Sequence, residues 1–173
     1  MLATDEVEEP ELAEPVRALR EAGARTELLS IKLGQIQAVQ HDLQPTLTFA
    51  VDKTLDQADP EDYDALLLRG GAVNADRLRT VPAVQSFIKQ INGAGKPMAV
   101  ICHAPRGPVP SGLPLGRTVT SYHTLQDDLR NTGATWVDRE VVVHGNLVTS
   151  RQPGDVPAFT REMPGLFAAA RGA

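Results

Sequence analysis

The stretch Met98-Ala99-Val100-Ile101-Cys102-His103-Ala104-Pro105 decides how this chain folds. Its four leading apolar residues predict a short buried strand. The strand runs directly into the single cysteine of the chain, Cys102, with His103 beside it. Pro105 falls where the first turn of a following helix would begin, a position that tolerates a missing N–H. A strand, a sharp turn and a helix start place the thiol at the carboxyl end of a sheet strand, where open α/β sheets carry their chemistry.

The remaining segments alternate between helical and strand-like patterns. Helical spacing of apolar residues predicts helices over about 11–22, 78–91, 124–131 and 156–170, with Pro164 kinking or splitting the last. Apolar runs predict strands over about 26–31, 63–68, 118–122, 140–143 and 147–150. Residues 35–52 suggest a small hairpin, with Phe49 and Val51 facing inward. This alternation predicts a largely parallel sheet covered on both faces, in one domain spanning residues 1–173.

The composition excludes several classes of protein. The chain has 173 residues, 42% of them apolar, and a formal net charge of −5, which argues against a nucleic-acid surface. No apolar run approaches the ~20 residues of a membrane span, and no leader pattern opens the chain. His41, His123 and His144 show no metal-ligand spacing with one another or with the cysteine. We therefore expect no metal or other cofactor, no nucleic-acid or membrane partner, and a cytoplasmic location.

The lone cysteine has two interpretations. A buried cysteine is usually an inert small hydrophobe. A thiol at the start of a helix is different, because the helix dipole and free N–H groups favour the reactive thiolate. The position of Cys102 after an apolar strand favours the reactive interpretation. His103 would serve as its base only if the turn swings the imidazole ring back toward the sulfur.

Two further features are expected at the same edge of the sheet. If the first strand lies beside the Cys102 strand, one carboxylate of the acidic run 5–9 would stand near the thiol. Crowding of two anions would raise the pKa of that carboxyl, and its protonated form would donate a hydrogen bond to the sulfur. Gly70-Gly71 ends another strand there. The pair forms either a simple tight turn or a set of backbone N–H groups open to an oxyanion.

Short segments along the chain form a pattern that is specific only when they are taken together. They are Ala3-Thr4-Asp5 with Glu8-Glu9 and Glu11-Leu12, 62–68 with Gly70-Gly71, 76–79, Gly95-Lys96-Pro97, Ile101-Cys102-His103, Gly116-Arg117, Thr120-Ser121-Tyr122, 127–131, Gly133-Ala134 with 136–138, and 145–151. In these segments the chain resembles the PfpI branch of the DJ-1/PfpI superfamily over nearly its whole length. The resemblance implies a flavodoxin-like three-layer α/β sandwich, with a mostly parallel sheet and a nucleophile elbow at Cys102.

The resemblance also implies roles for individual residues. Cys102 would be the nucleophile, and Glu8 the carboxyl that hydrogen-bonds its thiol. Gly71 and His103 would supply oxyanion N–H groups, with Gly70 beside them. The histidine would be completed by an acid from a neighbouring subunit, and the matching position here is Asp76.

A site shared between subunits implies a homodimer or a higher homo-oligomer with the site near the interface. Activities described for the family are intracellular cysteine peptidase, protein and nucleotide deglycase, and glutathione-independent glyoxalase. Expected partners are therefore small carbonyl compounds, glycated molecules or peptides.

Several positions depart from the family pattern. Only Met1 and Leu2 remain of a full central strand that precedes Ala3-Thr4-Asp5 in the family. Residues 106–110, Arg-Gly-Pro-Val-Pro, replace an apolar helix, and a proline inside a regular helix costs about 3 kcal/mol. A broken helix weakens the dipole that would favour a thiolate. Arg69 and Ala104 stand where the family usually has proline and glycine.

These observations leave three hypotheses. The leading one is a stress-response hydrolase or lyase that acts on carbonyl adducts or peptides through Cys102. The alternative is a non-catalytic redox sensor or chaperone-like stress protein, in which Cys102 is oxidised to sulfinic acid. The third is a structural relative with a degenerate elbow and an unreactive thiol.

Overall fold

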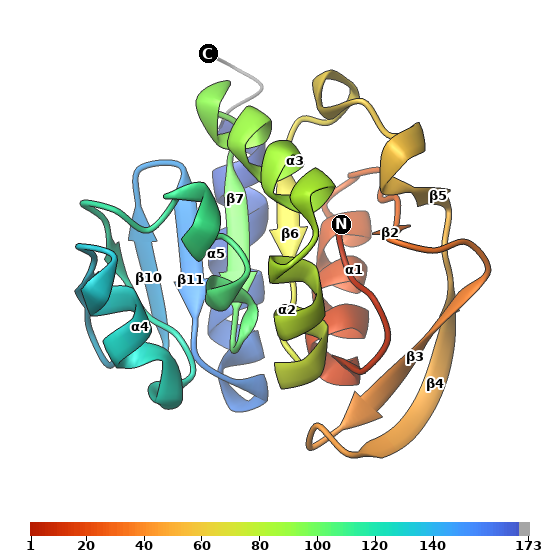
Figure 1. Ribbon diagram of the computed structural model, residues 1–173, viewed down its shortest axis with the longest axis horizontal. Coiled ribbons are helices and arrows are strands. Elements are labelled where there is room, and N and C mark those ends of the chain that lie inside the picture. The colour runs from red at the N-terminus through yellow and green to blue at the C-terminus, as the bar shows by residue number, and fades with distance from the viewer. Residues whose placement is uncertain (170–173) are drawn as a thin grey trace.

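The structure of the chain is a computed structural model that describes residues 1–169. Its main sheet has the order β10-β11-β7-β6. Strands β6 (Leu66–Leu68), β7 (Met98–Ile101) and β11 (Leu147–Ser150) are parallel, whereas β10 (Val141–His144) is antiparallel at the edge. The parallel strands run toward the bottom of Figure 1, so their carboxyl ends meet there. This is the edge at which the sequence predicts the site.

The first residues of the chain join this sheet to a second pair of strands. Leu2 forms single parallel bridges with Leu68 of β6 and with Leu29 of β2 (Leu29–Ser30). Strand β2 then pairs in parallel with β5 (Lys53–Thr54). Because Leu2 donates its N–H to Leu67 and Leu29 donates its N–H to Met1, the first two residues connect β6 to β2 through backbone hydrogen bonds.

Helices cover both faces of the main sheet. Helices α1 (Glu9–Glu21) and α5 (Val156–Ala169) lie on one face, and α2 (Ala72–Arg79) and α3 (Pro82–Gly93) lie on the other (Figure 1). A short helix, α4 (Gln126–Asn131), lies toward the β10 edge. This arrangement confirms the predicted three-layer α/β sandwich.

The alternation of side chains along the strands explains the two layers of core. Leu67, Ala99 and Ile101 point toward α1 and α5, where they pack with Phe159 and Met163. The residues that alternate with these along β6 and β7 point toward α3. They form a second core cluster with the apolar face of that helix: Leu66, Leu68, Met98 and Val100 from the strands, and Val84, Phe87, Ile88 and Ile91 from the helix. Strands buried on both faces read as continuous apolar runs, as the sequence of β6 and β7 does.

A smaller sheet lies beside this sandwich, with β1 (Val7–Glu8) paired in parallel to β3 (Gln35–Gln40). Strand β4 (Gln44–Ala50) completes the predicted hairpin with β3. Phe49 and Val51 are partly buried against the apolar cluster there, as the pattern predicted. The hairpin projects toward the carboxyl end of the main sheet (Figure 1).

Several boundaries differ from those predicted. The expected helix 78–91 is two helices, α2 and α3, because the chain turns at 80–81. After Cys102 the chain forms short 3₁₀ turns over Ala104–Arg106 and Val109–Ser111 instead of an α-helix. Strands β8 (Thr118–Val119) and β9 (Thr135–Trp136) pair with each other in parallel.

Helix α5 contains Pro164 and continues through it, while the predicted end of this helix at residue 170 lies outside the described residues. None of the helices within residues 1–169 combines the length and the apolar character that crossing a membrane requires.

Candidate active site

Cys102 lies on a strained turn at the carboxyl end of β7. Its φ of 61° is in the left-handed region, which a residue with a side chain seldom adopts. Two backbone hydrogen bonds hold it there: its N–H donates to Ser150 at 3.0 Å, and its carbonyl accepts from Tyr122 at 2.9 Å. Such strain persists only where the surroundings fix it, and it is concentrated at functional sites.

The carboxyl beside the thiol belongs to Glu11, whereas Glu8 was predicted for this position. Glu11 lies in the first turn of α1, is fully buried, and has its carboxyl beside the Cys102 side chain at Gly70. Its Oε2 also accepts the N–H of Gly70 at 2.9 Å. Burial is the main cause that raises the pKa of Glu11 to about 8. Glu11 is therefore mostly protonated at neutral pH and able to donate a hydrogen bond.

Glu8 has a structural role near the same site. Its Oε1 and Oε2 accept the backbone N–H groups of His41 and Asp42, at 3.0 and 3.2 Å, at the tip of the β3–β4 hairpin. The prediction failed because residues 7–8 form β1 and α1 begins at Glu9, so the helix carries Glu11, and not Glu8, under the thiol. The segment around Leu2, which was expected to lie beside the Cys102 strand, pairs with β6 instead, so β6 lies between it and β7.

The imidazole of His103 turns back toward the sulfur. Its Nδ1 lies 3.3 Å from Cys102 Sγ, and its ring stacks on Tyr122 with the ring centroids 4.6 Å apart. Burial lowers the pKa of His103, so the ring is mostly neutral at pH 7 and accepts a proton. Burial, followed by the Glu11 carboxyl, raises the pKa of the Cys102 thiol, while a hydrogen bond from the His103 backbone N–H lowers it. The resting form is a thiol with a base beside it.

Gly70 and Gly71 each allow a different close approach that a side chain would block. A Cβ at Gly70 would lie 2.6 Å from Cys102 Cβ and would overlap the Glu11 carboxyl. Gly71 has a φ of 90° and lies against the backbone of β1, where a Cβ would overlap the carbonyl oxygen of Glu6. The sequence predicted that backbone N–H groups at this glycine pair would be open to an oxyanion. The N–H of Gly70 is not free for that role, because it donates to Glu11.

Asp76 does not meet His103 within its own chain. It lies on α2 with 60% of its side chain exposed and forms an ion pair with Arg106, with 3.6 Å between Oδ1 and Nη1. A different carboxylate, that of Asp42, acts on the histidine and raises its pKa against the effect of burial. Sequence reasoning missed Asp42 because nothing in a hairpin pattern indicates which sheet edge the turn will approach.

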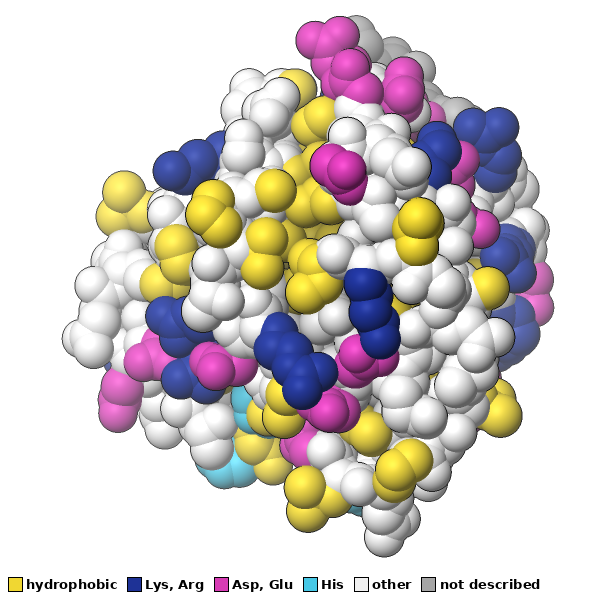
Figure 2. Space-filling model, turned by 45° about the vertical axis from the view of Figure 1, so that its right-hand side comes forward, with side chains coloured by type: hydrophobic (Ala, Val, Ile, Leu, Met, Phe, Trp, Pro, Cys, Tyr) yellow, Lys and Arg dark blue, Asp and Glu magenta, His cyan; other side chains and the backbone are white. Residues whose placement is uncertain are grey.

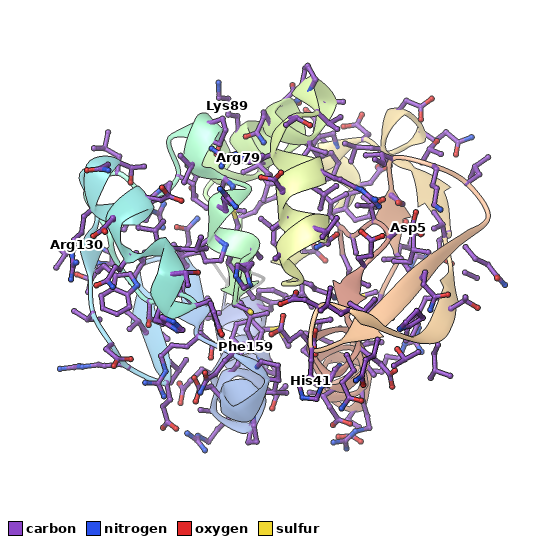
Figure 3. All side chains as sticks on the ribbon, turned by 60° about the horizontal axis from the view of Figure 1, so that its bottom comes forward. Asp5, His41, Arg79, Lys89, Arg130 and Phe159 are labelled. Carbon is purple, nitrogen blue, oxygen red and sulfur yellow. The ribbon has the colours of Figure 1, made fainter. Side chains whose placement is uncertain are left out.

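A cavity of about 410 Å³ opens over the thiol. It is lined by Glu8, His41, Asp42, Cys102, His103, Tyr122, Gln152, Pro153 and Gly154. Figure 3 views this end of the molecule and shows His41 at the hairpin tip that forms one wall. A volume of this size suits a small molecule. No cluster of three or more His, Cys, Asp or Glu side chains able to hold a metal occurs within residues 1–169.

Comparisons with known proteins identify the family of the chain. The model of the DJ-1/PfpI family matches residues 1–164. The chain is 38% identical over 166 residues to deglycase PfpI of Pyrococcus furiosus, covering 96% of both chains. It is 35% identical over 171 residues to protein/nucleic acid deglycase 2 of Escherichia coli, covering 98% of this chain and 96% of that one.

A solved structure shares the fold. It is a two-domain protein of Anabaena variabilis with DJ-1/ThiJ/PfpI-like and ferritin-like domains, and it superposes with a TM-score of 0.89 at 29% identity. The match covers 96% of this chain and 48% of that protein, about half its length. With the strained cysteine and its buried glutamate, these likenesses show that the chain belongs to the DJ-1/PfpI family.

Proposed function

We propose that this chain is a cysteine-dependent hydrolase or lyase that removes carbonyl adducts, with Cys102 as the nucleophile. The observation that carries the proposal is the arrangement around Sγ: the base Nδ1 of His103 lies 3.3 Å away, and the protonated carboxyl of Glu11 lies on the Gly70 side. A nucleophile with a base within hydrogen-bond reach is the arrangement typical of covalent catalysis. The names of the relatives from Pyrococcus furiosus and Escherichia coli support a deglycase.

The first chemical step follows from these positions. The Cys102 thiol gives its proton to His103 Nδ1, and the sulfur forms a bond to the carbonyl carbon of the substrate. The carbonyl π pair moves to the oxygen, which takes the proton from the His103 imidazolium, so the net change is addition of S–H across the carbonyl group. The Glu11 carboxyl is buried and outside the lining of the cavity, and it keeps its proton through this step. The strained turn holds the sulfur in place before the substrate arrives.

The test is a comparison of wild type with Cys102→Ala and Cys102→Ser. We would measure consumption of methylglyoxal and release of free amine from methylglyoxal-treated N-acetyl-lysine, with circular dichroism to verify folding. Wild-type activity that is lost in both variants supports the proposal. Full activity in Cys102→Ala would contradict it. Cleavage of a fluorescent peptide, run alongside, separates deglycation from proteolysis.

A redox sensor is the second candidate, and the buried Glu11 carboxyl beside Cys102 favours it. The raised pKa of the thiol slows attack on a carbonyl and oxidation by peroxide alike, because both use the thiolate, and the 3₁₀ turns after the elbow provide no long helix dipole that would lower this pKa. The Glu11 carboxyl would donate a hydrogen bond to a sulfinate on Cys102. Intact-mass spectra after graded peroxide test this: a stable gain of about 32 Da, ahead of further oxidation, is expected.

We infer that the chain also associates with itself, as the resemblance implied. Apolar side chains are exposed on the side of the molecule formed by β3, β4, α2 and the β2–β3 connection: Ile31, Leu33, Leu43, Leu47 and Val73. Figure 2 turns this side toward the viewer and shows apolar side chains interspersed with charged ones. Light scattering after gel filtration would test the inference, and a monomer across the micromolar range would contradict it.

A further inference from the structure

Gln152 lies on the wall of the cavity that faces away from the β3–β4 hairpin. It comes two residues after Ser150, the last residue of β11, whose carbonyl accepts the N–H of Cys102 at 3.0 Å. Strand β11 lies on one side of β7, whereas β6 and then the hairpin lie on the other (Figure 1). A substrate bound to the thiol is therefore flanked by Gln152 on one side and by Asp42 of the hairpin tip on the other.

The loop that carries Gln152 is held in place by an ion-pair network. The guanidinium of Arg151 donates to both carboxylate oxygens of Asp155, at 2.8 and 3.1 Å, and to Asp138 at 2.6 Å. The N–H of Asp155 also donates to the carbonyl of Gln152 at 2.9 Å. A bidentate pair adds geometric specificity as well as energy. The backbone of Gln152 thus has a fixed position relative to the thiol.

The side chain of Gln152 is available to a substrate. It is exposed, and its amide forms no hydrogen bond with any residue of the described range 1–169. The acidic side chains of the lining already have partners: both oxygens of Glu8 accept hairpin N–H groups, and Oδ1 of Asp42 accepts the N–H of Ala72. A side-chain amide has both a donor and an acceptor, which match the C=O and N–H of a peptide group.

The size and charge of the cavity indicate the kind of adduct that it accepts. A volume of about 410 Å³ leaves most of the space empty around a free dicarbonyl such as methylglyoxal, but it suits an adduct on an amino-acid side chain. The charged side chains of the lining, Glu8 and Asp42, are acidic, and among the described residues no Lys or Arg lines the cavity. A phosphate-bearing adduct would meet like charge there, whereas a neutral peptide would not.

We propose that Gln152 is a specificity-determining residue whose side-chain amide binds a peptide group of the substrate while Cys102 reacts with the carbonyl carbon. The preferred substrates are adducts on peptides or proteins, ahead of free dicarbonyls and glycated nucleotides. This inference rests on the proposed reaction of Cys102 with carbonyl adducts. Gln152 lies on the β11 side of the thiol, away from the β3, β4 and α2 face inferred to associate, so the proposal applies equally to a site that a neighbouring subunit helps to form.

The experiment measures alkylation of Cys102 in the full chain, which does not depend on carbonyl chemistry. The probe is acetyl-alanyl-lysyl-alanine amide with a chloroacetyl group on the lysine Nε, from which the thiolate displaces chloride. Intact-mass spectra give its labelling rate at a series of concentrations. Iodoacetamide, which carries no peptide, gives the intrinsic reactivity of the thiol in each variant.

Gln152→Met keeps the length of the side chain and removes its amide. Gln90→Met, at an exposed position of α3 outside the cavity lining, is the matched control. We expect peptide labelling of wild type to saturate. In Gln152→Met the half-saturating concentration should rise by roughly three- to tenfold, because hydrogen bonds to the peptide group are lost, and the effect should not fall on the limiting rate. In Gln90→Met the half-saturating concentration should not change.

A second probe tests the preference by charge. It carries the chloroacetyl group on the amine of 2-aminoethyl phosphate, and it should label wild type more slowly than the peptide does at equal concentration. Faster labelling by the phosphate probe would overturn the proposed substrate class. Labelling by the peptide that does not saturate in wild type, an unchanged half-saturating concentration in Gln152→Met, or an equal rise in Gln90→Met would overturn the role of Gln152. A failure of the carbonyl reaction would be recognised separately, because it would leave peptide labelling saturable and dependent on Gln152.

Discussion

Gly70 and Glu11 are in direct contact beneath the thiol. The backbone N–H of Gly70 donates to Oε2 of Glu11 at 2.9 Å, and the position of a Cβ on residue 70 is already occupied by that carboxyl. The same Cβ would lie 2.6 Å from the Cβ of Cys102. The glycine at the end of β6 therefore allows the acid and the nucleophile to approach each other, because any side chain there would separate them.

The first prediction follows from this contact. Gly70→Ala should destabilise the chain by about 1–3 kcal/mol, the usual cost of overpacking, and should displace Glu11 from the sulfur. Chemical denaturation and the pH dependence of Cys102 alkylation measure the two effects. Gly93→Ala is the matched control, since its Cβ would meet open space at the end of α3, and it should leave stability unchanged or slightly higher. Equal effects of both variants would contradict the contact.

The second prediction concerns the pH dependence of stability. Glu11 has a pKa of about 8 in the folded chain against a usual value of 4.5, so between these values the folded state binds more protons than the unfolded state. Stability must then fall as the pH rises through this window. In Glu11→Gln this contribution is absent, so we expect its free energy of unfolding to change less between pH 5 and pH 8.

Urea denaturation at a series of pH values tests this. Gln keeps an oxygen for the Gly70 N–H, so the comparison removes the ionisable group with little change in shape. Glu9→Gln, two residues earlier on the same helix and partly exposed, is the control. If wild type and Glu11→Gln gave parallel curves, the assignment of a buried proton to Glu11 would be wrong.

The parts of the site that follow directly from a strand were predictable from the sequence. An apolar run ending in Cys102, and another ending in Gly70-Gly71, place both groups at one edge because parallel strands end together. The break after Cys102 was also predictable, because prolines at 108 and 110 cannot continue a regular helix.

The choice between Glu8 and Glu11 was not predictable. It depends on whether α1 begins at residue 9 or a turn later, and helix ends are the least certain feature of a sequence pattern. Asp42 could not be predicted for another reason. Its place in the cavity depends on long-range hydrogen bonds, in which its backbone N–H donates to Glu8 and its carboxylate accepts the N–H of Ala72, and no local sequence pattern indicates them.

The third prediction separates the role of Glu8 from that of Glu11. Glu8→Ala removes the acceptor for the N–H groups of His41 and Asp42, so both amides should exchange with solvent faster, and the chain should lose about 1–3 kcal/mol. The contact between Glu11 and Cys102 should remain. Hydrogen exchange of the hairpin peptide provides the measurement, with the peptide that covers α3 as internal reference. Unchanged exchange at 41–42 would show that Glu8 does not hold the turn.

The last prediction concerns Arg69, which takes the place of a proline in the family pattern. Its side chain is buried, Nε and Nη1 have no hydrogen-bond partner within residues 1–169, and Nη2 contacts the sulfur of Met1. Burial lowers its pKa to about 9, so it is still charged at pH 7. Such a charge is costly, and replacing buried ionic groups with apolar residues has stabilised proteins by about 1–4 kcal/mol.

Arg69→Met keeps a long flexible side chain and removes the charge, so it should raise the free energy of unfolding. Arg25→Met is the control, because the Arg25 side chain is 91% exposed and its loss should change stability by less than about 0.5 kcal/mol. Urea denaturation of both variants decides the matter. A loss of stability in Arg69→Met would mean that the guanidinium has a stabilising partner, in which case an anion held near Met1 would be the first one to seek.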